Sequence, residues 1–277
     1  MTDTNLRVGL IVRGSDVPAW QARTIERMLA RTDAEVTHVV ANAATNEQGL
    51  DHYLDRAREN PLWTPVGALY RLRGPPAHRR GRSLDSIAGL GDPEVVRVEP
   101  EPAPDFGNVL PEEGVEALAE TDVAVRFAFG ILKGDALDAP EHGVLSFHHG
   151  DLREYRGQPS GFWEYLHGDP TAGVTLQRIN ETLDGGEIVA FESVDIADAA
   201  TWTEVRDRLF VASDDLLVKG IENVAHGIDP LSPDELGDLY SLPEGTDVLK
   251  YVFKECVGRM RKYASEIQVG KAPKAVE

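Results

Sequence analysis

The start of the chain constrains the fold most, because it predicts a strand, a helix and a second strand in close succession. Residues 6–12 (LRVGLIV) form an apolar run typical of a buried strand, and residues 35–42 (EVTHVVAN) predict a second one. Between them, Ser15 is suited to cap a helix that reaches about Arg31. Strand, helix and strand at this spacing form a βαβ unit with parallel strands. We therefore expect an α/β fold with a doubly wound, mostly parallel sheet.

The remaining chain continues this alternation and ends in a helical tail. No G-x-G-x-x-G motif follows a predicted strand, so dinucleotide binding through that motif is not expected. Thr201 and Glu204 form a capping box that opens a long helix. The tail predicts an amphipathic helix over 246–267, because its apolar residues recur at helical spacing. The further predicted strands cover 94–100, 122–132, 143–148, 173–179 and 187–196, and the further helices 111–120 and 160–168.

Residues 143–188 hold the densest group of side chains capable of catalysis. His148 ends the apolar run 144–148, and Asp184 follows 36 residues later in a Leu-Asp-Gly-Gly turn. A helix and a returning strand between them would bring both side chains to one cleft, because ligands of open α/β sheets bind beyond the carboxyl ends of the strands. A histidine beside a carboxylate is the minimum set for general-base catalysis near neutral pH.

The same segment resembles the formyltransferases that use 10-formyltetrahydrofolate. Their pattern reads G-x-x-N-x-H-x-S-L-L-P-x-[YW]-R-G, followed by an aromatic-rich helix, T-G-V-T and L-D-x-G-x-I. Weaker similarity extends the resemblance to about residues 6–226. The residues that match in register, without a gap, are Gly143, His148, Tyr155, Arg156, Gly157, Trp163, Gly168, Gly173, Val174, Thr175, Leu183, Asp184, Gly186 and Ile188.

The resemblance implies a fold, a reaction and a set of site residues. It implies a catalytic domain over 1–226 and leaves residues 227–277 as a helical C-terminal extension. It also implies that His148 takes the proton of an attacking amine while Asp184 orients the imidazole. The implied co-substrate is 10-formyltetrahydrofolate, and no metal is expected. The residues implied to line the folate pocket are Phe129, Gly130, Ile131, Leu183 and Gly185.

Two departures from the family pattern bear on the chemistry. The family's asparagine, two positions before the histidine, is Ser146 here, and S-L-L-P is replaced by residues 150–153 (GDLR). In the family this asparagine donates to the formyl oxygen as it becomes an oxyanion, and losing one such donor typically costs about 10²–10³ in rate. A serine hydroxyl also donates, and Ser146 shares a strand face with His148. The alternatives are an active enzyme and a folate- or ligand-binding homologue that has lost catalysis.

Residues 43–94 form an insert whose fold the sequence predicts only in part. A helix is expected over 48–58, followed by a link that contains proline and tryptophan. In the insert, a dozen residues carry five arginines, and arginine suits bidentate recognition of phosphate. We therefore expect Arg79 and Arg80 to bind an anionic acceptor. The alternative is a loop that the surrounding acidic surface neutralises. The five arginines are Arg71, Arg73, Arg79, Arg80 and Arg82.

The identity of the formyl acceptor stays open among three kinds of amine: initiator methionyl-tRNA, glycinamide ribonucleotide and an amino sugar on a nucleotide. A net charge of −19 disfavours a nucleic-acid partner, whose binding site should be basic. The tail lacks the alternating pattern of the β-barrel appendage that tRNA-specific members carry. We expect a small, phosphorylated amine as the acceptor, with methionyl-tRNA formyltransferase as an alternative. The sequence does not indicate an oligomeric state.

The composition predicts a cytoplasmic protein that acts on small molecules. The single cysteine, Cys256, rules out an intrachain disulfide, and no apolar run approaches the roughly 18 residues of a membrane span. The first residues do not resemble a signal peptide. The 47 acidic residues against 28 lysines and arginines resemble adaptation to high internal salt, because about 1 M salt reduces the Debye length to about 3 Å. An ordinary acidic cytosolic protein is the alternative.

Overall fold

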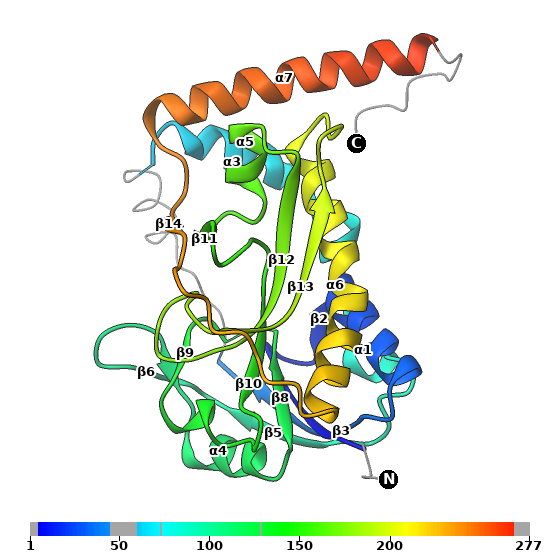
Figure 1. Cartoon of the computed structure of the whole chain (residues 1–277), viewed down its shortest axis with the longest axis vertical. Coiled ribbons are helices and arrows are strands. Elements are labelled where there is room, and N and C mark those ends of the chain that lie inside the picture. The colour runs from blue at the N-terminus through cyan, green and yellow to red at the C-terminus, as the bar shows by residue number, and fades with distance from the viewer. Residues whose placement is uncertain (1–4, 45–59, 73, 128, 269–277) are drawn as a thin grey trace.

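A computed structural model describes residues 5–44, 60–72, 74–127 and 129–268 (Figure 1). Its centre is a seven-stranded sheet in the order β13-β12-β10-β8-β1-β3-β5. Neighbouring strands from β5 to β10 are parallel, whereas β12 runs antiparallel to both β10 and β13. The predicted mostly parallel α/β fold is therefore confirmed. The strands of this sheet are β1 (Arg7–Val12), β3 (Glu35–Asn42), β5 (Glu94–Val98), β8 (Val123–Arg126), β10 (Val144–His148), β12 (Thr171–Arg178) and β13 (Glu187–Asp195).

Helices cover both faces of this sheet. On one face α1 (Ala19–Arg31) packs against α6 (Trp202–Ala225), and on the other α4 (Glu112–Ala119) contacts β3 and β5. Figure 1 shows α1 and α6 side by side, with α4 away from them. The central strand β1 supplies side chains to the hydrophobic cores on both faces, with Leu10 in one and Ile11 in the other. Burial on both faces explains why this strand reads as an unbroken apolar run.

Several short strands and helices lie outside the seven-stranded sheet. Three small sheets form outside it: β2 pairs with β4, β11 with β14, and β7 with both β6 and β9. The described short elements are β2 (Asp16–Pro18), η1 (Ala77–Arg79), β4 (Gly81–Ser83), η2 (Leu84–Ser86), β6 (Glu101–Pro102), β7 (Asn108–Val109), β9 (Leu132–Lys133), η3 (Gly134–Leu137), β11 (Tyr155–Gly157), α5 (Phe162–His167) and β14 (Asp238–Tyr240).

The first helix begins later than the sequence predicted. Ser15 is not its N-cap: the residue before the helix is Pro18, which provides no side-chain capping bond. Residues 16–18 instead form β2, which pairs antiparallel with β4 of the insert. The main-chain N–H of Ala19 then donates to the Arg80 carbonyl oxygen at 2.8 Å. The local capping signal failed because a distant segment satisfies the backbone groups at this point.

Part of the insert forms a helix where we expected only a link. This helix, α3 (Trp63–Leu72), packs through Trp63, whose ring centroid lies 5.5 Å from that of Phe162. The helix predicted over 48–58 lies outside the described residues. Arg73 and the side chain of Arg71 lie outside them as well. The described part of the insert is therefore anchored to the body of the protein by an aromatic contact.

The tail is fastened to the body at two places. Strand β14 runs parallel to β11, the segment that carries the Tyr-Arg-Gly turn. The predicted tail helix is confirmed as α7 (Gly245–Gln268), which lies across one end of the molecule in Figure 1. It docks through Tyr251, whose hydroxyl lies 2.6 Å from that of Tyr70. Several of its apolar residues, among them Phe253 and Met260, face solvent instead of the body.

Helix α5 holds a buried carboxyl group. Glu164 is only 3% exposed, and its Oε1 has no hydrogen-bond partner among the described residues. Burial is the main cause, and the charges of Asp169, Glu154 and Asp151 a smaller one, of a rise in the pKa of Glu164 from 4.5 to about 8. The side chain is therefore neutral in the folded protein at neutral pH.

We expect the folded protein to lose stability as the pH rises from about 6.5 to 8. In this window a glutamate in the unfolded chain has released its proton, whereas folded Glu164 keeps it, so the free energy of unfolding falls by up to about 1.4 kcal/mol per pH unit. Burial of His149 lowers its pKa to about 3, and the opposite slope that results acts only below about pH 6.5. Denaturant unfolding from pH 6 to 8.5 measures the slope.

Glu164→Gln should remove most of this slope, because the amide stays neutral in both states. The exposed Glu192 on β13 offers a matched control, and Glu192→Gln should keep the wild-type slope. An unchanged slope in Glu164→Gln would mean that Glu164 is ionised in the folded protein.

Candidate active site

His148 lies at the carboxyl end of β10 and is 7% exposed. Its Nε2 lies 2.8 Å from the main-chain oxygen of Tyr155. A carbonyl oxygen only accepts, so Nε2 carries the proton and the neutral ring keeps a lone pair on Nδ1. That Nδ1 lies 3.6 Å from Oδ1 of Asp184. The two residues, 36 positions apart in the sequence, are thus neighbours in the fold.

Asp184 is fixed from two sides in the turn between β12 and β13. Its own backbone has a φ of 44°, in the left-handed region. The Gly157 N–H donates to its Oδ2 at 3.0 Å. The Arg156 guanidinium donates to the main-chain oxygens of Asp184 at 2.9 Å and of Leu183 at 2.6 Å. The Tyr-Arg-Gly turn therefore aims the carboxylate at the imidazole.

Ser146 faces an arginine that the sequence analysis did not single out. It is 1% exposed, and β10 pairs it in register with Arg126 of β8. Nη2 and Nε of Arg126 donate to Ser146 Oγ at 2.9 and 3.2 Å. Burial lowers the pKa of Arg126, and the negative charge of Asp184 opposes that shift. The signal that could have found it is an arginine inside an otherwise apolar strand, DVAVRF.

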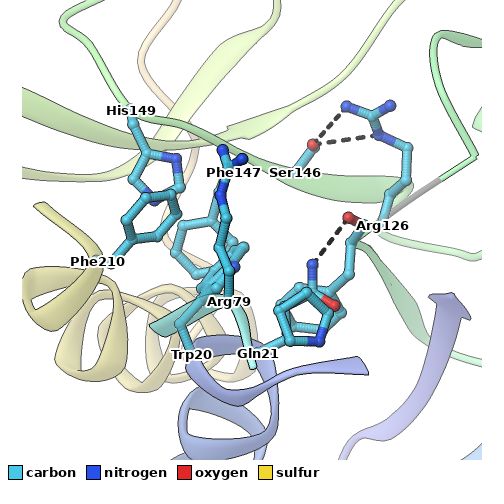
Figure 2. A pocket seen from close by; sticks show the side chains of 10 residues that line it. Trp20, Gln21, Arg79, Arg126, Ser146, Phe147, His149 and Phe210 are labelled. Atoms are coloured by element: carbon cyan, nitrogen blue, oxygen red, sulfur yellow. Dashed lines mark hydrogen bonds between the residues drawn. The ribbon is translucent and has the colours of Figure 1, made fainter. Parts of the chain in front are cut away.

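A cavity of about 390 Å³ opens beside these residues (Figure 2). It lies at the carboxyl ends of the neighbouring strands β8 and β10, on the edge of such sheets where ligands usually bind. Ser146 and Arg126 form part of its wall, whereas His148 and Asp184 do not line it. Its lining residues are Pro18, Trp20, Gln21, Arg79, Arg126, Phe127, Ser146, Phe147, His149 and Phe210.

The arginines of the insert have different surroundings in the structure. Arg79, at the end of η1, lines the cavity and has no ion pair with a described residue. Arg80 is not among the lining residues, although its neighbour provides part of the wall. Arg82 is paired with Glu26 at 2.7 Å, so for this residue the neutralised-loop alternative applies.

His149 lines the cavity as an uncharged aromatic ring. Its Nε2 lies 3.0 Å from Ser213 Oγ, and its ring centroid lies 4.2 Å from that of Phe210. Burial lowers its pKa to about 3, so it stays neutral at ordinary pH. With Trp20 and Phe127 it makes one side of the cavity aromatic, a feature that our sequence analysis missed because these residues are far apart in the chain.

The two segments expected to line the folate pocket lie next to each other. The first contains Phe129 (φ 89°), Gly130 (φ 68°) and Ile131, and the second is the turn with Leu183 and Gly185. Glu181 joins them, because its carboxylate accepts a bond from the Gly134 N–H at 3.0 Å and pairs with Lys133 at 3.3 Å.

Metal-binding groups of side chains and membrane-spanning helices are both absent among the described residues. Within the described ranges, no three His, Cys, Asp or Glu side chains are grouped so that they could hold a metal ion. Of the helices in that part of the chain, none is long and apolar enough to cross a bilayer.

Comparison with known sequences identifies the segment that carries this site. Residues 104–221 match the sequence model of the formyl transferase family. This segment is related to the formyl transferases. The methionyl-tRNA formyltransferase of Bacillus subtilis (strain 168) is 35% identical over 129 residues, which are 46% of this chain and 41% of that protein. The one of Lachnospira eligens is 32% identical over 174 residues, 60% of this chain and 53% of that protein.

The chain thus spans about a third to a half of the length of the curated relatives that it matches. Solved structures of formyltransferases share the fold over a longer stretch. The N-formyltransferase of Helicobacter canadensis, in complex with folinic acid and dTDP-3-aminofucose, has a TM-score of 0.56 at 11% identity, over 90% of this chain and 80% of that one. Glycinamide ribonucleotide transformylase 1 of Symbiobacterium toebii has a TM-score of 0.53 at 17% identity, over 86% and 96%.

Gly150 offers a test of how tightly His148 is held. A Cβ at this position would lie 2.7 Å from both His148 Nε2 and the Tyr155 carbonyl oxygen. We expect Gly150→Ala to break the bond between them and to lower the free energy of unfolding by about 1–3 kcal/mol, as overpacking does. Gly81→Ala is the control, because nothing lies within 4 Å of its Cβ. Denaturant unfolding and the NMR signal of the His148 Nε2–H report the two effects; an unperturbed signal would contradict the expectation.

Proposed function

We propose that this chain is an enzyme that transfers a formyl group from 10-formyltetrahydrofolate to the amine of a small, anionic acceptor. The observation that carries the proposal is the pairing of His148 with Asp184 at 3.6 Å, at the carboxyl end of a central strand within the formyl transferase segment. A base and a carboxylate that orients it are what proton removal from an amine requires. The relation to one-carbon transferases supplies the reaction class.

In the proposed reaction, the acceptor nitrogen attacks the formyl carbon and passes a proton to His148. Nδ1 is the acceptor atom, because Nε2 is already committed to the Tyr155 carbonyl. The imidazolium that forms faces Asp184, whose negative charge stabilises it. The proton then leaves with N10 of the folate as the bond from N10 to the formyl carbon breaks. No water or metal is consumed.

The segments with Phe129 and Leu183 are the proposed walls of the folate site. Glu181 links these two segments through its contacts with Gly134 and Lys133. Folinic acid in the Helicobacter canadensis structure, which shares this fold, supports folate as the donor. The acceptor would enter from the cavity beside Ser146, since that cavity reaches the same end of β10.

An anionic acceptor is proposed from the side chains of the cavity. Arg79 reaches its wall without a carboxylate partner among the described residues, and the rest of the wall is largely aromatic. Such a site suits a molecule with a flat or apolar part and a phosphate or carboxylate. Methionyl-tRNA stays a candidate acceptor because the curated relatives are named methionyl-tRNA formyltransferases. A screen of amines, with formyl transfer detected by mass spectrometry at low and molar salt, separates these acceptors.

His148→Asn and Asp184→Asn test the catalytic pair. We expect each to lower kcat by at least about 10²-fold, the usual contribution of general-base catalysis. The melting temperature should stay near the wild-type value, since each substitution is close in shape. His142→Asn is the control and should keep wild-type turnover, because His142 precedes β10 and lies at the opposite end of this strand from His148. Full activity in both site variants would contradict the proposal that His148 is the general base. Folate binding by the wild type without any formyl transfer would favour a protein that has lost catalysis.

Arg79→Ala and Arg80→Ala form a matched pair for the acceptor. We expect Arg79→Ala to raise the acceptor KM about tenfold or more while kcat and folate affinity stay unchanged, because a contact made equally in ground and transition states alters KM alone. Arg80→Ala should have no such effect, since Arg80 does not line the cavity. Equal KM values in the wild type and both variants would show that the arginine cluster is only a neutralised loop.

A further inference from the structure

We infer that Arg126 is a catalytic residue of this site, whose guanidinium stabilises the oxyanion formed on the formyl group. The inference rests on the proposed formyl transfer. It assigns a role to a residue that the family pattern does not include, and it explains how a chain with a serine at position 146 could keep its activity.

The position of Arg126 follows from the register of the sheet. Ser146 and His148 are two positions apart on β10, so their side chains lie on the same face. Arg126 ends β8 opposite Ser146, and two of its nitrogens donate to Ser146 Oγ at 2.9 and 3.2 Å. The guanidinium is therefore on the face that carries the proposed base, and it is near enough for the charge of Asp184 to act on it.

Arg126 differs from several other arginines of this protein in that no carboxylate of a described residue pairs with it. Arg7, Arg82 and Arg178 each hold a carboxylate in a short ion pair. Arg126 has no ion pair with a described residue, and its Nη1 makes no hydrogen bond within the described part of the chain. Its side chain instead forms part of the cavity wall, as Figure 2 shows. A half-buried guanidinium that lines a cavity, with an Nη1 that has no partner among the described residues, is well placed to bind a negative charge.

The reaction generates such a charge at one step. When the acceptor nitrogen bonds to the formyl carbon, the π electrons of the carbonyl group move to its oxygen. The tetrahedral intermediate then collapses, the carbonyl re-forms, and N10 leaves with the proton that His148 had taken. A donor aimed at this oxygen accelerates the step because it binds the oxyanion more tightly than the neutral carbonyl.

Ser146 has a second part in this arrangement. Its oxygen accepts from Arg126, which leaves its own hydroxyl hydrogen free to donate. The serine thus holds the guanidinium in place and adds a weaker donor. The arginine side chain is also longer than that of serine, so its donors extend further from the strand than the serine hydroxyl does.

Steady-state kinetics of Arg126→Ala and Arg126→Lys test the assignment, with 10-formyltetrahydrofolate and the acceptor found by the screen. We expect Arg126→Ala to lower kcat about 10²–10³-fold and to change the acceptor KM less than about threefold. Arg126→Lys should recover part of the loss, because an ammonium keeps the charge without the planar pair of donors. Added guanidinium ion at millimolar concentration should raise the turnover of Arg126→Ala at least about tenfold, but not that of the wild type.

Arg178→Ala is the control for loss of an arginine from another strand of the same sheet, β12. It should leave kcat within about twofold of the wild type, since Arg178 pairs with Glu187 and does not line the cavity. If Arg126→Ala does not fold, Arg126→Gln and Arg126→Lys carry the same comparison of kcat.

Three outcomes would overturn the inference. The first is a kcat of Arg126→Ala equal to that of the wild type. The second is a large rise in acceptor KM with kcat intact, which would make Arg126 an anchor for an anionic group. The third is a loss that guanidinium does not restore in a folded variant. Absence of formyl transfer by the wild-type protein would instead refute the proposed function, so the two failures are distinguishable.

Discussion

The hydrogen bonds from Arg156 to the turn that carries Asp184 hold the candidate site together. One guanidinium reaches the carbonyl oxygens of Leu183 and Asp184, and the next residue, Gly157, donates to the Asp184 carboxylate. The same loop presents the Tyr155 carbonyl to His148. Three segments that are distant in the sequence thereby keep fixed positions, and the distance between imidazole and carboxylate depends on all of them.

The C-terminal tail supports the Tyr-Arg-Gly turn that holds Asp184. Strand β14 pairs with β11, and a Cβ on Gly157 would meet the Tyr240 carbonyl oxygen at 2.1 Å. The turn therefore accepts only glycine at this position, which also has a φ of 89°. The extension after residue 226 is thus part of the support of the site, and its removal would expose the backbone of the loop that holds Asp184.

Charge is distributed unevenly between the surface and the site. The chain carries a net charge of −19, yet the cavity wall contains Arg79 and Arg126, and His149 there is neutral because burial lowers its pKa to about 3. An acidic surface with a positive cavity would repel anions at long range in dilute salt. Screening at high salt removes that long-range term while buried contacts persist, so an anionic acceptor is compatible with the acidic composition.

The sequence by itself predicted the strands of the main sheet, most of the helices and the candidate pair of His148 and Asp184. Apolar runs predicted the parallel strands, the Thr201–Glu204 capping box marked the start of α6, and the family pattern joined His148 to Asp184. These features are local, or follow a pattern with fixed spacing. Only the tertiary structure showed that Ser15 does not cap α1, that Arg82 is neutralised while Arg79 faces a cavity, and that Arg126 contacts Ser146. The reason is that strand pairing across the sheet decides which distant side chains meet, and no local periodicity encodes that choice.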